Sequence, residues 1–285
     1  QHNMDRLKVQ DNKDLERDVK RNGIVNTNTV ALEKAKNARM HILEKMNDVI
    51  SAPKELSDNT PAMKKITVQS IYVGKCKLIG ERGNRTGMYK EAVSKPVRLS
   101  KRGLMNDFIG DKTIHGGATK ALHHFPSEHY VTLSKNFPLL KPIFCPGSIG
   151  ENISTTGITE GNIYLGDIFS LGSAKVQLSE PRKPCWKIDA RYAQQGVAAF
   201  MFTNSISGWY YCVLEEGKVS LGDELKLEHR VERNPSLLEY QKVITALRPN
   251  PMTLRKFSQI DSLSNDVARR LIERAEWLSR NSESN

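Results

Sequence analysis

Hydrophobic and polar positions alternate along the middle of the chain with the period of β-strands. From Lys65 to Lys75, polar positions separate the apolar residues Ile66, Val68, Ile71 and Val73. Similar short runs, divided by turn residues, continue to Leu227 and beyond at 95–99, 163–171, 175–178, 208–214 and 224–229. Many short strands without long helices must hide their edges, so we expect a mainly β fold with a closed barrel over residues 63–230.

Helical periodicity dominates the two ends of the chain. Residues 29–50 carry apolar side chains at three- and four-residue steps, after a polar segment and before a proline-containing linker at 51–61. Near the C-terminus we expect three short helices at 235–247, 252–259 and 265–280, the first capped by Asn234. Inside the barrel region, only 128–136 and 191–201 show a short helical pattern.

These patterns predict three parts. Residues 1–62 form a helical extension or fusion segment with its linker, residues 63–230 form the β-barrel domain, and residues 231–285 form a three-helix C-terminal domain. We assign no chemistry to the three helices, which either dock on the barrel or make the contact of a homodimer.

The charge distribution points to an anionic ligand for the middle part. The chain of 285 residues has a net charge of +11, and residues 63–230 hold 23 Lys and Arg against 15 Asp and Glu. A phosphorylated cofactor, nucleic acid or simply a basic solvated surface would each account for this excess. Nucleic acid is not favoured, because no recognition helix, RNP motif or zinc finger is present.

Several classes of protein are not supported by the sequence. No apolar run is long enough to span a bilayer, and the first 20 residues are too polar for a secretory signal, so we expect a cytoplasmic protein without a membrane partner. The cysteines at 76, 145, 185 and 212 have no metal-finger or disulfide spacing. The dinucleotide glycine fingerprint is also missing, and we expect neither NAD nor flavin as a cofactor.

One stretch, from Ser179 to Lys187, carries the clearest chemistry. Here Cys185 lies among the cations Arg182, Lys183 and Lys187, on a loop that two prolines, at 181 and 184, stiffen. Positive charge favours the thiolate, which is the form that attacks electrophiles and binds metals. A small buried hydrophobic residue is the alternative for any lone cysteine.

Two further stretches could contact a ligand. In 111–122, Gly116 and Gly117 would let the backbone approach an anion, to which His115 and Lys120 would donate hydrogen bonds. In 147–154, Glu151 and Asn152 could bind a polar heterocycle, although a plain turn explains this stretch better when it is taken alone. No metal-ligand spacing links the histidines at 123, 124 and 129, which we interpret as core or surface residues.

The ordered combination of these motifs resembles the MOSC domain family, named for the C-terminal domain of molybdenum cofactor sulfurase. The motifs are His115-Gly-Gly, Lys120-Ala-Leu, Phe125-Pro-Ser-Glu-His-Tyr, Gly150-Glu-Asn-Ile-Ser-Thr, Asn162-Ile-Tyr-Leu-Gly-Asp and Pro181-Arg-Lys-Pro-Cys. The likeness extends from about residue 63 to the C-terminus and is greatest to the YiiM-type branch, which adds three helices after the barrel. Residues 1–62 match nothing expected in that branch.

The resemblance implies a β-barrel that binds a pyranopterin molybdenum cofactor, with Cys185 as the metal ligand and catalytic residue. It also implies a cofactor pocket lined by Arg182, His115, Gly116, Gly117, Lys120, Glu151 and Asn152. Proteins of this branch are associated with the reduction of N-hydroxylated compounds, notably N-hydroxylaminopurines, and such a reaction needs a separate electron-donating reductase. The expected function is therefore detoxification of N-hydroxylated bases.

Two other functions stay open at this point. The chain could relay sulfur as a persulfide on Cys185 for metal–sulfur or cofactor assembly. It could also be a non-catalytic basic binding module, for which steeply salt-dependent affinity for nucleic acid would be diagnostic.

Overall fold

The computed structural model describes residues 6–9, 12–18, 23–26, 65–111 and 115–281. It divides the chain into two compact units, Gln1–Ala62 and Met63–Asn285. In the described part of the chain, no helix has the length and apolar character needed to cross a membrane.

The first unit contains a small antiparallel sheet. Its strands are β1 (Arg6–Val9), β2 (Asn12–Asp18) and β3 (Gly23–Asn26), with β2 in the centre. The sequence predicted only a polar segment here, because these strands carry few apolar residues and the alternation is weak. The predicted helix at 29–50 and the linker at 51–61 lie outside the described residues.

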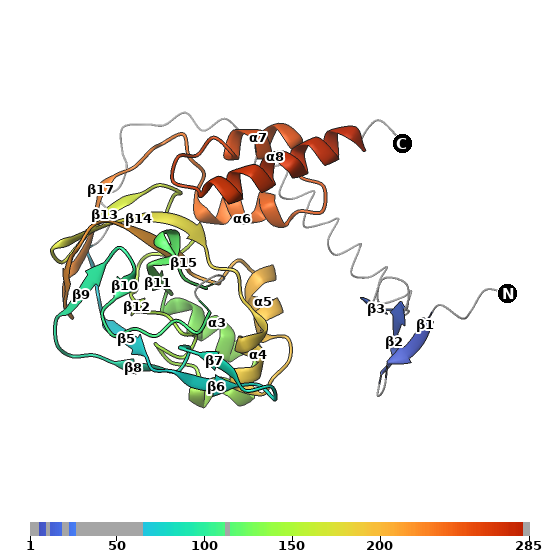
Figure 1. Cartoon of the computed structure of the whole chain (residues 1–285), viewed down its shortest axis with the longest axis horizontal. Helices are drawn as coiled ribbons and strands as arrows, with labels where there is room; N and C mark the ends of the chain where they lie inside the picture. Colours follow the sequence, from blue (N-terminus) through green and yellow to red (C-terminus); the bar gives the residue numbers. More distant parts are fainter. Residues whose placement is uncertain (1–5, 10–11, 19–22, 27–64, 112–114, 282–285) are drawn as a thin grey trace. The chain divides into compact units, whose positions relative to one another are not determined.

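The second unit is built on one curled sheet of nine strands (Figure 1), in the order β4-β17-β13-β14-β15-β11-β12-β5-β8. The strands are β4 (Ile66–Thr67), β5 (Ser70–Gly74), β8 (Lys90–Ala92), β11 (Leu122–His124), β12 (Ile153–Ser154), β13 (Ile168–Leu171), β14 (Ala174–Pro181), β15 (Trp209–Glu215) and β17 (Glu224–His229). Two small sheets accompany it, made of β10 (Gly103–Leu104), β9 (Val97–Ser100) and β16 (Gly217–Val219), and of β6 (Lys77–Ile79) and β7 (Asn84–Thr86).

The segment 66–74 closes this sheet into a barrel. Its first half pairs with β17, where Ile66 lies opposite Leu225, and its second half pairs with β12, where Ile71 lies opposite Ile153. Between them, the Val68 amide donates to the Asp223 carbonyl (2.8 Å) and the Gln69 amide to the Ser154 carbonyl (3.3 Å). One continuous segment thereby bridges β17 and β12, as closure of a barrel requires. The predicted mainly β fold is confirmed.

Two hydrophobic cores fill the second unit. The larger lies inside the barrel, includes the fully buried Trp209 and Tyr211, and continues to the C-terminal helices through Leu237, Leu254 and Leu271. The smaller lies under the helices α3 (Glu128–Asn136), α4 (Trp186–Tyr192) and α5 (Val197–Thr203) and includes Phe125 and Ile188. Two 3-10 helices, η1 (Ala118–Lys120) and η2 (Pro138–Ile143), connect these elements.

The C-terminal helices are α6 (Leu237–Thr245), α7 (Pro251–Phe257) and α8 (Asn265–Arg280), which lie together at one end of the barrel (Figure 1). The predicted cap was wrong for α6. Ser236 caps this helix in a capping box with Glu239, whereas the Asn234 side chain donates to the Leu165 carbonyl (2.7 Å). The capping box satisfies two amide groups reciprocally and therefore outcompetes the asparagine. The division between residues 230 and 231 stays a prediction.

We expect a chain that begins at Met63 to fold on its own. Both hydrophobic cores found among the described residues lie within Met63–Asn285, so this unit has a core of its own. Calorimetry should record one cooperative transition at a Tm within a few degrees of that of the full chain. Aggregation, or melting without a cooperative transition, would show instead that the first 62 residues complete the fold.

Candidate functional site

A pocket opens beside the Cys185 loop. Five segments, 86–90, 107–110, 115–123, 149–152 and 182–187, contribute to its wall together with Tyr210. The empty space, its open mouth included, is about 630 Å³, which lies within the usual range for sites that bind small molecules.

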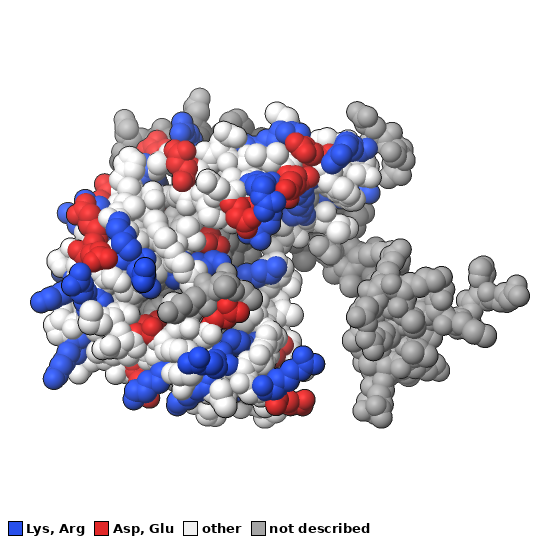
Figure 2. Space-filling view, in the orientation of Figure 1, with Lys and Arg blue, Asp and Glu red and all other residues white. Residues whose placement is uncertain are grey.

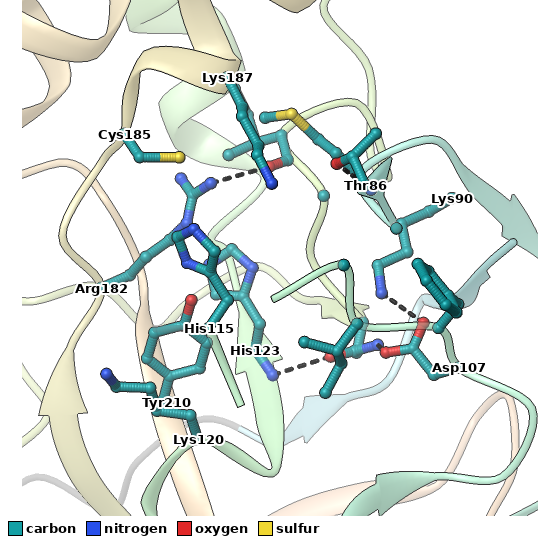
Figure 3. A pocket seen from close by; sticks show the side chains of 18 of the residues that line it. Thr86, Lys90, Asp107, His115, Lys120, His123, Arg182, Cys185, Lys187 and Tyr210 are labelled. Carbon is teal, nitrogen blue, oxygen red and sulfur yellow. Dashed lines mark hydrogen bonds and ion pairs between the residues drawn. The ribbon is translucent and has the colours of Figure 1, made fainter. Parts of the chain in front are cut away.

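The end of strand β14 places Cys185 at this pocket. The Arg182 amide still donates to the Gly208 carbonyl (3.0 Å), after which the chain leaves the sheet. Cys185 is extended, with φ −124° and ψ 167°, and precedes the first residue of α4. Its carbonyl accepts from the Ile188 amide (3.0 Å), which fixes the loop against the helix. The sulfur is half-buried and points into the pocket (Figure 3).

Next to Cys185, the guanidinium of Arg182 is buried with only part of its hydrogen-bonding capacity used. The residue is 8% exposed, and Nη2 donates to the Ile149 carbonyl (3.2 Å). Nη1 is buried and has no partner among the described residues. A buried cationic donor left unpaired is costly, and an anionic ligand would satisfy it.

Further basic groups surround this arginine. Lys187 and Lys120 line the pocket with His115 (Figure 3). The Lys187 ammonium donates to the Arg85 carbonyl (3.0 Å), and that of Lys120 lies 3.8 Å from a carboxylate oxygen of Glu180. Burial, and then the charges of Arg182, Lys187 and Lys120, lower the pKa of His115 to about 4 against the weaker effect of Asp111. The imidazole is therefore neutral at neutral pH and lies in a strongly positive potential.

His123 belongs to the pocket, although the sequence analysis interpreted it as a core or surface residue. It lies on β11, is 4% exposed, and its ring lies 5.2 Å from that of Tyr210. Its Nε2 is buried without a partner in the described structure. Burial and the charge of Arg182 hold its pKa well below the usual value, so the ring is neutral. The Leu-His-His sequence of the strand could not indicate that this side chain faces a pocket.

The opposite wall consists of Lys90, Asp107 and Asn152. The Asn152 side chain donates to Asp107 Oδ2 (2.8 Å) and to the Tyr72 carbonyl (3.2 Å), and its Oδ1 accepts from the His123 amide (3.0 Å). Asp107 also pairs with the Lys90 ammonium. The sequence pointed to Asn152 but gave no signal for Lys90 or Asp107, because an isolated lysine and aspartate are common on any surface.

Three predicted pocket residues do not line it. Glu151 is fully buried and accepts from the Tyr130 hydroxyl (2.5 Å) and the amides of Gly147 (2.5 Å) and Ile149 (3.2 Å). It thus holds the turn that carries the Ile149 carbonyl toward Arg182, and burial raises its pKa. Gly116 and Gly117 lie outside the wall. Gly117 precedes the first residue of η1 and has a φ of 103°, a conformation that favours glycine. This glycine is therefore required by the backbone turn and does not line the pocket.

Cys185 is the one pocket cysteine among the described residues. Cys76 is exposed and accepts a hydrogen bond from Arg85 Nε (3.3 Å), and Cys145 is also exposed. Cys212 lies on β15, where burial raises its pKa. Within the described ranges, no group of three or more His, Cys, Asp or Glu could hold a metal ion by itself. A metal at this pocket would need ligands that a cofactor supplies.

Surface charge differs between the two halves of the second unit. In the face shown in Figure 2, Lys and Arg predominate over the lower part of the barrel, whereas both signs alternate over the C-terminal helices. On α8, for example, Arg269 pairs with Asp266 and Glu273. The excess positive charge predicted for the middle of the chain therefore gathers on the barrel.

Comparison with known proteins defines the class of the molecule. A model of the MOSC domain matches residues 111–226. Protein YiiM of Escherichia coli (strain K12) is 38% identical over 161 residues, which are 56% of this chain and 71% of that protein. The chain belongs to the MOSC domain family, and the resemblance recognised in its motifs is confirmed.

Two further comparisons bear on fold and chemistry. The crystal structure of Escherichia coli YiiM matches with a TM-score of 0.63 at 29% identity, over 74% of this chain and 92% of that one. A protein of Gibberella moniliformis named "Reductase" is 28% identical over 222 residues. That alignment spans 76% of this chain but only 39% of the larger relative.

We predict that His115 reports the charge of the pocket. In the free chain, its ring signals should titrate with a pKa of about 4 in NMR. Inorganic pyrophosphate should raise this pKa, because an anion stabilises the imidazolium form and offsets Arg182 and Lys187. Signals of the exposed His229, which does not line the pocket, should not respond to pyrophosphate. Titration of His115 near 6.5 in the free chain would contradict the positive potential.

Proposed function

We propose that the protein binds a pyranopterin molybdenum cofactor and reduces N-hydroxylated compounds such as N-hydroxylaminopurines. The observation that carries this proposal is the Cys185 thiol beside a buried Arg182 guanidinium with one unpaired nitrogen. Family membership and the name of the reductase relative support the same class of chemistry.

The residues of the pocket fit such a group. Arg182, Lys187 and Lys120 would hold its phosphate, since a guanidinium can bind two phosphate oxygens in parallel. The unpaired Nε2 of His123 and the neutral ring of His115 would hydrogen-bond its polar heterocycle. Thiolate is a soft ligand of the kind that binds sulfur-rich metal centres, and Cys185 would supply it.

When bound, the molybdenum centre supplies two-electron redox chemistry, for which side chains have no equivalent. The protein contributes orientation and an enclosed site. The substrate would lie between the Cys185 wall and the Lys90–Asp107 wall, which Asn152 fixes through its three side-chain hydrogen bonds. Electrons would come from a separate reductase in the cytoplasm, and we assign no role to NAD or flavin on this chain.

A sulfur relay is the alternative function. It is favoured by the half-buried position of Cys185, from which a persulfide could reach an acceptor outside the pocket. The same cations would stabilise the persulfide anion. This function predicts sulfur on Cys185 that cyanide releases as thiocyanate, without molybdenum.

Replacement of Arg182 by alanine should weaken retention of the cofactor. Loss of charge-assisted hydrogen bonds costs about 1.5–3 kcal/mol, which corresponds to a roughly ten- to hundredfold weaker affinity. Molybdenum content after gel filtration is the measurement. The control is Arg98→Ala, which removes an exposed arginine paired with Glu216 outside the pocket. Equal molybdenum in both variants would remove Arg182 from the site.

Replacement of Cys185 by serine should leave the fold intact, lower bound molybdenum and abolish reduction of 6-N-hydroxylaminopurine. A hydroxyl is a harder and far less acidic ligand than a thiol, so it replaces thiolate poorly. Cys76→Ser should do none of these things, because Cys76 does not line the pocket. Full activity and metal content in Cys185→Ser would exclude both the molybdenum and the persulfide functions.

A further inference from the structure

The pocket wall opposite Cys185 contains a buried ammonium group. The side chains of Lys90 and Asp107 are each only 6% exposed and form an ion pair. Figure 3 shows this pair across the pocket from Cys185, Arg182 and Lys187. A charged lysine is seldom buried without a structural or chemical reason.

Three hydrogen bonds fix Asp107 in place, and they use only one N–H donor of the Lys90 ammonium. Oδ1 accepts from the Gly74 amide (2.6 Å) and from Lys90, and Oδ2 accepts from Asn152 Nδ2 (2.8 Å). An ammonium has three N–H donors. Asp107 is its one hydrogen-bond partner among the described residues, so two donors remain for a molecule in the pocket.

The other polar groups of the pocket are poor proton donors at neutral pH. His115 and His123 are neutral, since burial and nearby cations hold their pKa values low. Arginine does not release its proton in proteins, and burial raises the pKa of Tyr210. Lys187 and Lys120 lie on the anion-binding side. Burial lowers the pKa of Lys90 and outweighs the charge of Asp107, which raises it. Lys90 is therefore a stronger acid than an exposed lysine.

We propose that Lys90 is the general acid that protonates the oxygen released when the N–O bond of the substrate is broken. This role rests on the proposed reduction of N-hydroxylated compounds and adds to it a residue that the family motifs did not indicate. Asp107 is the positioning residue, since its carboxylate is fixed by three hydrogen bonds and holds the ammonium at the wall.

The reaction balances with Lys90 as the source of one proton. An N-hydroxylated substrate R–NH–OH takes up two electrons and two protons and gives R–NH₂ and water. The N–O bond breaks, the Lys90 ammonium gives its proton to the departing oxygen, and water gives the second proton to nitrogen. Solvent then reprotonates Lys90. The electrons come from a reductant outside the chain, which is a reduced viologen in the experiment below.

The test compares two leaving groups in the cofactor-loaded protein. Benzamidoxime releases its hydroxyl as water and needs the acid, whereas its O-acetyl ester releases acetate, which needs no proton. Lys90→Met should reduce kcat for benzamidoxime by about 100- to 10,000-fold, the usual contribution of a general acid. For the ester, kcat should change less than about threefold. A purely structural role of Lys90 would lower both rates together and would overturn the proposal.

Lys90→Arg separates charge from proton donation. It keeps the ion pair with Asp107, which protects the fold if Lys90→Met proves unstable, but its guanidinium cannot give up a proton. We expect it to be slow with benzamidoxime and normal with the ester. Recovery of the benzamidoxime rate in Lys90→Arg would overturn the proposal. The surface control is Lys75→Met, which removes an exposed lysine paired with Glu91 (2.6 Å) and should be normal with both.

The pH profile gives a second criterion. The titratable groups that interact electrostatically with Lys90 are Asp107, Glu151 and His123. In the unaltered chain, the benzamidoxime rate should fall as the pH rises through the pKa of Lys90, which lies below 10.5. The ester rate should lack this alkaline limb. A limb that persists in Lys90→Met would assign the proton to another group.

Molybdenum content and Tm provide readouts besides activity. Both should match the unaltered chain in Lys90→Arg, because Lys90 is not assigned to the cofactor. If the unaltered chain with reduced viologen converts neither compound, the proposed function fails and this inference fails with it. If the unaltered chain converts benzamidoxime and Lys90→Met does so equally well, only the inference fails.

Discussion

Every polar group of Asn152 is hydrogen-bonded, and its five hydrogen bonds reach three residues that lie far apart in the sequence. Its amide donates to the His123 carbonyl (2.8 Å) on β11, and its carbonyl accepts from the Tyr72 amide (2.7 Å) on β5. The side chain adds hydrogen bonds with the His123 amide, the Tyr72 carbonyl and the Asp107 carboxylate. Asn152 thus connects β11 and β5, the two neighbours of β12, to both walls of the pocket. Loss of the Asn152 side-chain amide would leave several buried groups without hydrogen-bond partners at once. This costs far more free energy of folding than the loss of one contact.

The Arg182 guanidinium shows the opposite arrangement, because its buried Nη1 has no partner among the described residues. Arg182 is buried beside His115 and His123, whose pKa values are lowered first by burial and then by the charge of the guanidinium. The fully buried carboxylate of Glu151 accepts its hydrogen bonds from the Tyr130 hydroxyl and two backbone amides. Maintaining positive potential without a ligand lowers the stability of the fold, and it favours any anion that enters. Stability and affinity are therefore in opposition at this wall.

The sequence predicted those parts of the structure that depend on local pattern. Alternation located most of the barrel strands, and the motif around Cys185 located one wall of the pocket. Two kinds of feature were missed. The helix expected at 191–201 is two helices, because Ala193 ends the first with a φ of 47° and Gly196 precedes the second with a φ of 94°. His123, Lys90 and Asp107 were missed because their importance depends on which strand face or loop meets the pocket. Burial and pairing over long sequence separations set these positions.

Closure of the barrel by residues 66–74 also constrains the order in which the fold can be completed. The strand that begins the second unit pairs with β17, which lies near the end of the barrel sequence. During synthesis the chain emerges from its N-terminus, so β4 has no partner until residues 224–229 have been made. Contacts of such separation slow folding. Until that moment the Ile66 strand has an open edge, which is a template for pairing with another chain.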